Sequence, residues 1–313
     1  MKILFTGASS FTGHWFVTKL AERGHDVWAT FTRASADDYG SDIRGQRVRR
    51  ILEKSQPVFA CRFGDERFLK LLKEEKFDLL CHHAADVTNY RSPGFDVARA
   101  VANNSFRAGN VLQSLQAGEG SLLLTGSFFE PGEGAGSDGL PAFSPYGVSK
   151  RQTAERFQHE CQEIGVRMGK FVIPNPFGPW EEPRFISYLA RTWSAGQVAA
   201  VRTPDYIRDN IHVSLLSAAY VEFAEQFPHA AAFTKLNPQG YVESQGAFSE
   251  RVAREMRSRT SWECGLELAV QTVFDEPMER MNTDPIDAQK LGWSESAAWD
   301  ELAEYYERTL AGT

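Results

Sequence analysis

The chain has 313 residues, of which 42% are hydrophobic and 24% are charged, and its formal net charge is −7. These proportions are typical of globular proteins and exclude a disordered or membrane-embedded chain, and the length is sufficient for two lobes. Because the charge is negative and the lysines and arginines are scattered, we expect neither nucleic acid nor an anionic membrane as a partner.

The first half of the chain alternates short apolar runs with helical stretches, which is the pattern of a parallel sheet whose strands are joined by covering helices. The predicted strands are Lys2–Phe5, Asp26–Phe31, Pro57–Arg62, Phe77–His82, Ser121–Thr125 and Arg167–Ile173. The predicted helices are Thr12–Arg23, Asp65–Glu75, Ala98–Gln116 and Tyr146–Ile164, and a loop rich in Gly, Ser and Pro spans Gly132–Pro145. The expected fold class is α/β with a doubly wound parallel sheet.

The pattern changes beyond Pro174, where prolines, tryptophans and shorter segments continue up to a final predicted helix at Glu295–Thr309. We therefore predict a dinucleotide-binding domain at residues 1–173 and a smaller C-terminal α/β lobe at residues 174–313. The second lobe would mainly bind substrate, and some of its segments would return to the first domain.

The cysteines and the N-terminus bear on the compartment. The four cysteines have neither close pairing nor metal-ligand spacing, which favours buried free thiols, a reducing environment and no metal site. The first residues run directly into a predicted strand, without a basic segment followed by an apolar stretch of signal length. A cytoplasmic location is therefore expected.

A glycine-containing loop, TGASSFTG, occupies Thr6–Gly13 between the first predicted strand and the first predicted helix. Gly7 would allow a tight turn, and Gly13 would let the helix pack close to the strand while its free amides face a pyrophosphate. This placement predicts a Rossmann-like dinucleotide site. The alternative is an ordinary turn that contains glycine.

The segment after the second predicted strand bears on which dinucleotide is bound. An acid there would accept hydrogen bonds from both adenosine ribose hydroxyls and select NAD, but the segment reads Thr30-Phe31-Thr32-Arg33. Its hydroxyls and the Arg33 guanidinium suit a 2′-phosphate, so NADP is favoured over NAD. The alternative is that Arg33 is a solvated loop residue.

Three residues indicate acid-base chemistry. Tyr146 and Lys150 are four apart in SPYGVSK, so on a helix they share one face, and the ammonium would lower the pKa of the phenol. Ser127 ends the segment SLLLTGS, which contains the predicted fifth strand, and open α/β sheets place their chemistry at strand ends; its hydroxyl could stabilise a developing charge on a substrate oxygen. The alternatives are a solvated Tyr/Lys pair and a serine that only caps a turn.

Together these residues resemble the Ser/Tyr/Lys triad and the glycine fingerprint of the extended short-chain dehydrogenases, the nucleotide-sugar epimerase and dehydratase family. Two departures are Ser10, in place of the middle glycine, and Arg62, where members often carry an Asp at the adenine. Further family segments are similar to CHHAAD, NNSFRAGN, IPNPFGPW and YIRDNIHV, and they occur here in the family's order. In the last of them, Ser214 replaces the first acid that follows His-Val.

The resemblance implies a set of site residues and a quaternary state. The implied cofactor contacts are Gly7, Ser9, Ser10, Phe11, Thr12, Gly13, Arg33, Ala84, Ala85, Asn104, Tyr146, Lys150 and Pro174. The implied substrate contacts are Ser127 and, at the phosphates of a nucleotide-linked sugar, Asn175 and Arg208. Family members also pair through two long helices, which implies a homodimer through the predicted helices Ala98–Gln116 and Tyr146–Ile164.

Several reactions remain open within this family. Dehydratases follow the active-site Ser or Thr with acidic residues, but Phe128 and Phe129 occupy those positions and Glu130 comes one residue later, which disfavours a 4,6-dehydratase. An epimerase and a 4-keto-sugar reductase both remain, and Arg33 mildly favours the reductase. A non-catalytic cofactor sensor or scaffold, and an enzyme that reduces a small carbonyl compound, are further alternatives.

Overall fold

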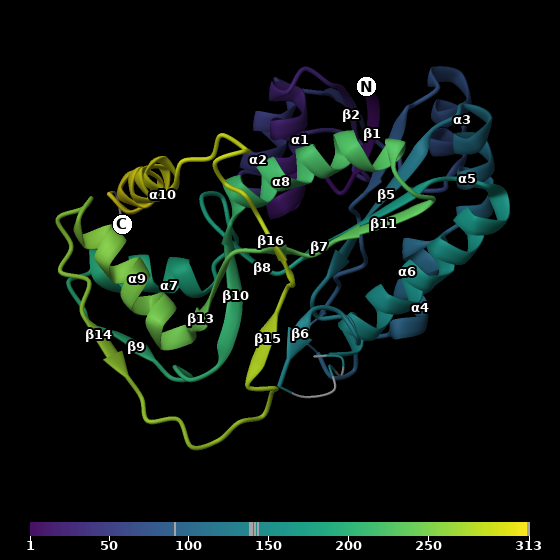
Figure 1. Ribbon diagram of the computed structural model, residues 1–313. Helices are drawn as coiled ribbons and strands as arrows, with labels where there is room; N and C mark the ends of the chain where they lie inside the picture. Colours follow the sequence, from purple (N-terminus) through teal and green to yellow (C-terminus); the bar gives the residue numbers. More distant parts are fainter. Residues whose placement is uncertain (91, 138–139, 141, 143, 312–313) are drawn as a thin grey trace. The chain divides into compact units, whose positions relative to one another are not determined.

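The computed structural model describes residues 1–90, 92–137, 140, 142 and 144–311 (Figure 1). The chain divides into two compact units. Unit 1 comprises residues 1–133, 141–173 and 217–237, and unit 2 comprises residues 134–140, 174–216 and 238–313. The predicted boundary at 173/174 is one of the junctions between the units, whereas residues 217–237 group with unit 1. No helix among the described residues is long and apolar enough to cross a membrane.

Unit 1 contains a seven-stranded sheet in which every neighbouring pair is parallel, in the order β11-β7-β5-β4-β1-β2-β3. Its strands are β1 (Lys2–Thr6), β2 (Asp26–Thr30), β3 (Gln56–Val58), β4 (Leu79–His82), β5 (Ser121–Ser127), β7 (Met168–Ile173) and β11 (Phe233–Leu236). The chain moves outward from β1 to β3 and then returns to the other side of β1 with β4. This reversal confirms the doubly wound topology, and open α/β sheets bind their ligands at the carboxyl ends of the strands where the order reverses, here β1 and β4.

Helices cover both faces of this sheet (Figure 1). They are α1 (Phe11–Glu22), α2 (Ile43–Leu52), α3 (Glu66–Glu75), α4 (Val97–Asn104), α5 (Ala108–Ala117), α6 (Pro145–Ile164) and α8 (Val213–Gln226), with short 3-10 turns at Asp37–Tyr39 and Phe227–His229. Apolar residues of α3, α5 and α6 form one core with the sheet, and Phe157 of α6 is fully buried there. On the other face, Phe16 of α1 stacks on Tyr220 of α8 with ring centroids 3.9 Å apart.

The structure differs from the predicted elements at four places, three in unit 1 and one, β6, in unit 2. The predicted helix Ala98–Gln116 is two helices, α4 and α5, because Arg107 adopts a left-handed conformation with φ of 51°. The α2 helix was not predicted, since its sequence IRGQRVRRIL has few apolar residues. The third strand is shorter than predicted, and β6 (Ala135–Gly136) lies within the predicted Gly132–Pro145 loop.

Unit 2 contains a smaller sheet, β13-β10-β15-β6, with β8 paired to β10. Its remaining strands are β8 (Asn175–Phe177), β9 (Ala199–Val201), β10 (Ile207–His212), β12 (Pro238–Gln239), β13 (Tyr241–Ser244), β14 (Leu266–Leu268), β15 (Glu279–Met281) and β16 (Asp284–Pro285). Its helices are α7 (Phe185–Ser194), α9 (Gln245–Arg257) and α10 (Glu295–Leu310). The three helices share an aromatic core that includes Phe177, Trp193, Phe248 and Trp299. Unit 2 is thus an α/β unit, as predicted, and α10 matches the predicted final helix Glu295–Thr309, whereas the sequence pattern did not reveal its other helices and strands.

Candidate active site

The glycine turn at the end of β1 has the backbone that a dinucleotide needs. Gly7 has φ of 80°, and a Cβ there would lie 2.7 Å from the amide nitrogen of Ala84. A Cβ at Gly13 would overlap the carbonyl oxygen of Gly7. Both positions therefore require glycine, and the turn leads directly into the N-terminus of α1, where backbone amides and the helix dipole favour a pyrophosphate. The residues present fit a dinucleotide.

Ser10 replaces the middle glycine of the fingerprint without strain. Its φ of −76° is accessible to any residue, so this turn does not need glycine at position 10. The Ser10 hydroxyl donates to the carbonyl oxygen of Gly7 at 2.9 Å and accepts from the amide of Gly13 at 3.1 Å. Ser10 therefore caps α1, and Phe11 and Thr12 are buried in the first turn of that helix.

His83 links this turn to the neighbouring strands, a role that the sequence did not reveal. Its Nε2 lies 3.1 Å from the hydroxyl oxygens of both Ser10 and Thr12, and its Nδ1 lies 2.9 Å from that of Thr125. Burial lowers the pKa of His83 to about 3, so the ring is neutral and offers one donor and one acceptor. The turn, the end of β4 and the end of β5 are thus joined through one side chain.

Asn104 has a structural role at the end of α4. Its side-chain oxygen accepts from the amide of Asp86 at 2.6 Å, and its carbonyl oxygen lies 2.8 Å from Nε2 of His82. The other nitrogen of His82 lies 2.9 Å from the hydroxyl of Thr6, which also accepts from the amide of Ala84 at 3.1 Å. Asn104 thereby fixes the segment after β4, which includes Ala84 and Ala85. Cofactor contacts by Ala84, Ala85 and Asn104 stay predictions.

The catalytic candidates lie at the end of β5 and the start of α6. Lys150 is buried, and its Nζ donates to the carbonyl oxygen of Thr125 at 2.5 Å. Burial lowers the pKa of Lys150 to about 8, partly opposed by the nearby charge of Glu130. Ser127 is the last residue of β5, and its hydroxyl oxygen accepts from the amide of Phe129 at 3.2 Å, which leaves its own proton for donation.

Tyr146 lies in the first turn of α6, one turn before Lys150. The start of α6 packs closely on the segment after Ser127, because a Cβ at Gly147 would overlap the carbonyl oxygen of Phe129. The Tyr146 ring contacts Tyr90 and Phe95 edge-on, with centroids 5.5 and 6.1 Å away. The structure thus brings the Tyr146 and Lys150 helix to the end of β5.

Two arginines, Arg33 and Arg44, lie near the ring of Tyr39, and Arg44 also contacts the glycine turn. The guanidinium of Arg33 lies 4.7 Å from the ring centroid of Tyr39 and donates to the carbonyl oxygen of Asp38. Arg44 of α2 lies 5.3 Å from the same ring, and it donates to the Ser9 hydroxyl from Nε at 3.1 Å and from Nη2 at 2.9 Å. Arg44 was missed because the helix that carries it was not predicted.

The predicted phosphate ligands belong to unit 2, where Pro174 precedes β8. The Asn175 amide donates to the side-chain oxygen of Asn210 at 3.3 Å. Arg208 is buried against Tyr206, donates to the carbonyl oxygens of Ile207, Pro277 and Met278, and pairs with Glu276 at 2.8 Å. The Arg208 guanidinium is thus held by groups of its own unit.

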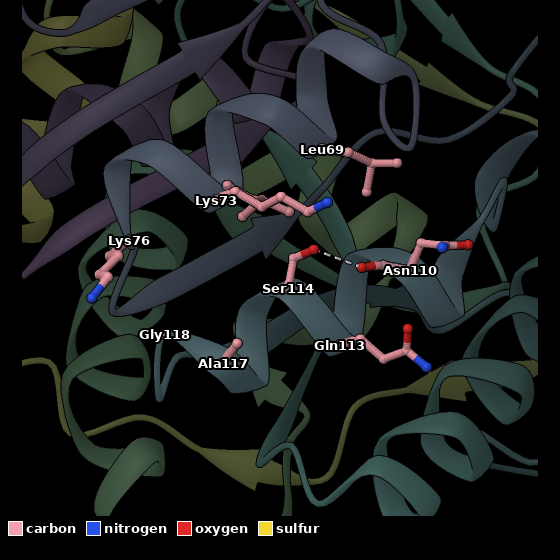
Figure 2. Close-up of a pocket in the computed structure, with 9 residues that line it drawn as sticks. Leu69, Lys73, Lys76, Asn110, Gln113, Ser114, Ala117 and Gly118 are labelled. Carbon is pink, nitrogen blue, oxygen red and sulfur yellow. Dashed lines mark hydrogen bonds between the residues drawn. The ribbon is translucent and has the colours of Figure 1, made fainter.

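A pocket of about 350 Å³ lies elsewhere in unit 1, between α3 and α5 (Figure 2). Its lining includes Lys73, Lys76, Asn110 and Gln113, together with apolar side chains such as Leu69. None of its lining residues belongs to the predicted site, and the Ser114 hydroxyl there only donates to the carbonyl oxygen of Asn110 in the preceding turn of α5. This pocket is therefore separate from the candidate site.

Comparisons with known proteins address the family and the fold. A family model described as the NAD dependent epimerase/dehydratase family matches residues 3–234. No curated protein matches the sequence. The structure is similar to UDP-glucose-4-epimerase from Stenotrophomonas maltophila with bound NAD and formylated UDP-arabinopyranose, at 19% identity and a TM-score of 0.73 over 100% of both chains.

Two further solved structures cover 99% of this chain and 100% of their own. One is UDP-glucuronic acid 4-epimerase from Bacillus cereus in complex with UDP-glucuronic acid and NAD, at 17% identity and a TM-score of 0.71. The other is UDP-glucose 4-epimerase from Thermotoga maritima with UDP-glucose, at 18% identity and a TM-score of 0.70. At these identities the similarity establishes a common fold.

Proposed function

Because the chain belongs to the NAD-dependent epimerase/dehydratase family, we propose that it is a nucleotide-sugar epimerase in which Tyr146 acts as the acid and base. One observation carries the proposal: a buried lysine, Lys150, holds its ammonium at the end of β5, one helical turn after Tyr146. The solved structures with the same fold include epimerases that bind UDP-sugars, so a UDP-linked sugar is the proposed substrate.

Different residues of unit 1 would bind the dinucleotide, transfer the proton and stabilise the developing charge. The glycine turn and the N-terminus of α1 would hold the dinucleotide, which supplies a hydride acceptor when it is bound. The Lys150 ammonium stabilises the Tyr146 phenolate, so that Tyr146 takes a proton from a sugar hydroxyl and later returns it. The Ser127 hydroxyl donates to the reacting sugar oxygen and stabilises the charge that develops there.

The surroundings of Ser127 weigh against a 4,6-dehydratase. Phe128 is 1% exposed and carries no titratable group. Glu130 is fully buried, where it accepts from the Ser127 amide at 2.8 Å and pairs with Lys170 at 2.6 Å. A carboxylate held in this way is not available to protonate a leaving hydroxyl.

Two arginines support NADP as the cofactor and keep a 4-keto-sugar reductase as the second candidate. The guanidiniums of Arg33 and Arg44 both lie near the ring of Tyr39, and Arg44 donates to the hydroxyl of Ser9 in the glycine turn. Guanidiniums bind phosphate through paired charge-assisted hydrogen bonds, which suits the 2′-phosphate of NADP. NADPH is the usual donor for reduction.

The proposed substrate contacts in unit 2 require an exchange of partners. Arg208 pairs with Glu276, whose side chain is 53% exposed, so a substrate diphosphate would have to replace that carboxylate. Asn175 would offer its side-chain amide to the same phosphates. Both contacts are part of the proposal.

The test combines a substrate panel with one substitution. The protein is incubated with UDP-glucose, UDP-glucuronic acid and their 4-epimers, with NAD or NADP, and products are followed by NMR. We expect epimer formation, which Tyr146→Phe lowers by roughly 10²-fold or more without loss of cofactor binding. Tyr90→Phe, which alters a ring that contacts Tyr146, is the matched control. An undiminished rate in Tyr146→Phe, or no hydride exchange with any sugar nucleotide, contradicts the proposal.

A further inference from the structure

Four charged side chains form a continuous network in unit 1, and three of them are buried. Lys170 of β7 pairs with Glu130 at 2.6 Å and with Glu133 at 2.7 Å, and Lys235 of β11, which is 40% exposed, pairs with the second oxygen of Glu133 at 2.8 Å. Asn237 donates to that same oxygen at 3.1 Å. We call Glu130, Glu133, Lys170 and Lys235 the charge network.

Charges in a protein interior need partners that offset their desolvation. Lys170, Glu130 and Glu133 are each at most 5% exposed, and a buried ion pair often stabilises a fold less than apolar side chains of similar size would. The Lys170 charge and the hydrogen bonds from Lys170, Lys235 and Asn237 outweigh burial and lower the pKa of Glu133 to about 2. The partners of Glu133 therefore keep it ionised, and removing one of them would leave a buried charge without compensation.

Gly126, near the end of β5, leaves the space that the Lys170–Glu130 ion pair occupies. A Cβ at Gly126 would lie 2.7 Å from Cε of Lys170 and 3.0 Å from Oε1 of Glu130, so a larger residue would displace the pair. Lys170 lies opposite Leu124 in the β5–β7 register, and Gly126 lies opposite Val172. The ion pair therefore lies directly against the last residues of β5.

Glu130 connects the network to the catalytic candidates. One of its carboxylate oxygens accepts from the backbone amide of Ser127 at 2.8 Å, and the other accepts from Lys170. Ser127 is thus held at its backbone by Glu130, while its side-chain oxygen accepts from the amide of Phe129. Lys150 is bound to the carbonyl oxygen of Thr125, two residues before Ser127 on the same strand.

We propose that Glu130 and Lys170 are positioning residues for the reaction proposed above: Glu130 fixes Ser127, and the balance of the two charges sets the charge state of Lys150. The inference rests on the proposed function, because it assigns the pair a role through the residues named there. Neither Glu130 nor Lys170 touches substrate in this scheme.

The electrostatic surroundings of Lys150 support this role. Besides Tyr146, which lies one helical turn earlier on α6, the titratable groups that act on Lys150 include Glu130, Lys170, His82 and His83. Burial lowers the pKa values of His82 to about 4 and His83 to about 3, so both rings are neutral near pH 7. Burial likewise lowers the pKa of Lys150 to about 8, while Glu130 raises it and Lys170 lowers it. Lys150 therefore keeps its proton below about pH 8 and loses it above.

The test titrates Lys150 directly, without any turnover. Protein labelled with ¹³C at the lysine ε-carbon is followed by NMR from pH 6 to pH 11, and the Lys150 signal is assigned by its loss in Lys150→Arg. Glu130→Gln keeps the shape of the side chain and removes the negative charge, so the pKa of Lys150 should fall by roughly 1 unit. The double variant Glu130→Gln/Lys170→Gln removes both charges and should return it towards the wild-type value.

Lys235→Gln is the matched control, because it removes a network charge that pairs with Glu133 and not with Glu130. Its Lys150 signal should titrate as in the wild type. An unchanged Lys150 titration in folded Glu130→Gln overturns the inference, as does an equal fall in all three variants. The readout does not depend on a sugar substrate, so it distinguishes failure of this inference from failure of the proposed function.

Discussion

At the scale of single residues, the proposed NADP preference involves two arginines from different segments. Arg33, shortly after β2, was predicted from the sequence as a cofactor contact, because its place after the second strand has a known meaning for cofactor choice, and this contact stays a prediction. Arg44 lies on α2 and reaches Ser9, 35 residues earlier in the chain. The contact between Arg44 and Ser9 depends on how α2 packs beside α1, and no local sequence pattern predicts that packing.

The proposed NADP preference gives a prediction at this scale. Arg44→Gln should weaken NADP binding by roughly tenfold or more, because it removes charge-assisted hydrogen bonds to a 2′-phosphate, and should change NAD binding little. Cofactor titrations monitored by fluorescence measure both dissociation constants. The control is Arg49→Gln on the same helix, which contacts the carbonyl oxygen of Gly40. An equal loss of affinity for NAD and NADP in Arg44→Gln would show that Arg44 does not bind the 2′-phosphate.

At the scale of elements, the start of α1 shows why the fingerprint tolerates one departure and not others. Position 10 has ordinary backbone angles and gains an N-cap from its serine hydroxyl. Position 13 faces the carbonyl oxygen of Gly7 so closely that no side chain fits. Glycine is therefore required by contact at position 13, whereas position 10 is free to carry a capping residue.

A pair of helix substitutions tests this distinction. Gly13→Ala should lower the free energy of unfolding by about 1–3 kcal/mol through steric overlap, and it should weaken dinucleotide binding. Gly109→Ala in α5 is the control, because a Cβ there would come no closer than 3.7 Å, at a Glu160 side-chain oxygen, to any described residue outside its own helix, and alanine is the better helix former there. Urea unfolding and cofactor titration provide the measurements. A Gly13→Ala protein as stable as Gly109→Ala would contradict the assigned contact.

At the scale of the whole molecule, the predicted homodimer concerns the surface of α4, α5 and α6. The exposed positions of α6 are polar or charged, and ion pairs link Arg151 with Glu155 and Arg156 with Glu160 along the helix. Phe106, between α4 and α5, is 46% exposed and offers an apolar anchor on unit 1. Interfaces place such aromatic residues at their centre and tolerate polar residues at the rim.

The homodimer stays a prediction with a direct test. Sedimentation equilibrium at micromolar concentration should give a dimeric mass for the wild type and a monomeric mass for Phe106→Asp, since a buried unpaired carboxylate is costly. Val270→Asp alters an apolar side chain of unit 2 that is 91% exposed and should leave the mass unchanged. A monomeric wild type contradicts the prediction.

The sequence by itself determined what depends on short-range patterns. The alternation of strands and helices predicts the parallel sheet, the glycine spacing predicts the turn after β1, and the four-residue interval between Tyr146 and Lys150 places both on one helix face. The glycine turn and the Tyr146/Lys150 interval are each encoded within one short segment, and each strand or helix of the alternation is read locally. The same patterns left α2 and most individual elements of unit 2 unrecognised, because polar and aromatic side chains there obscure the helical period.

Only the tertiary structure decided which distant residues meet. Residues 217–237 add β11 to the edge of the first sheet, and Lys170 pairs with Glu130, 40 residues away, in the space left by Gly126. In the sequence, Glu130 is only an acid displaced from the expected position. The positioning role proposed for Glu130 follows from its burial and its partners, and both arise when strands far apart in the chain become neighbours in one sheet.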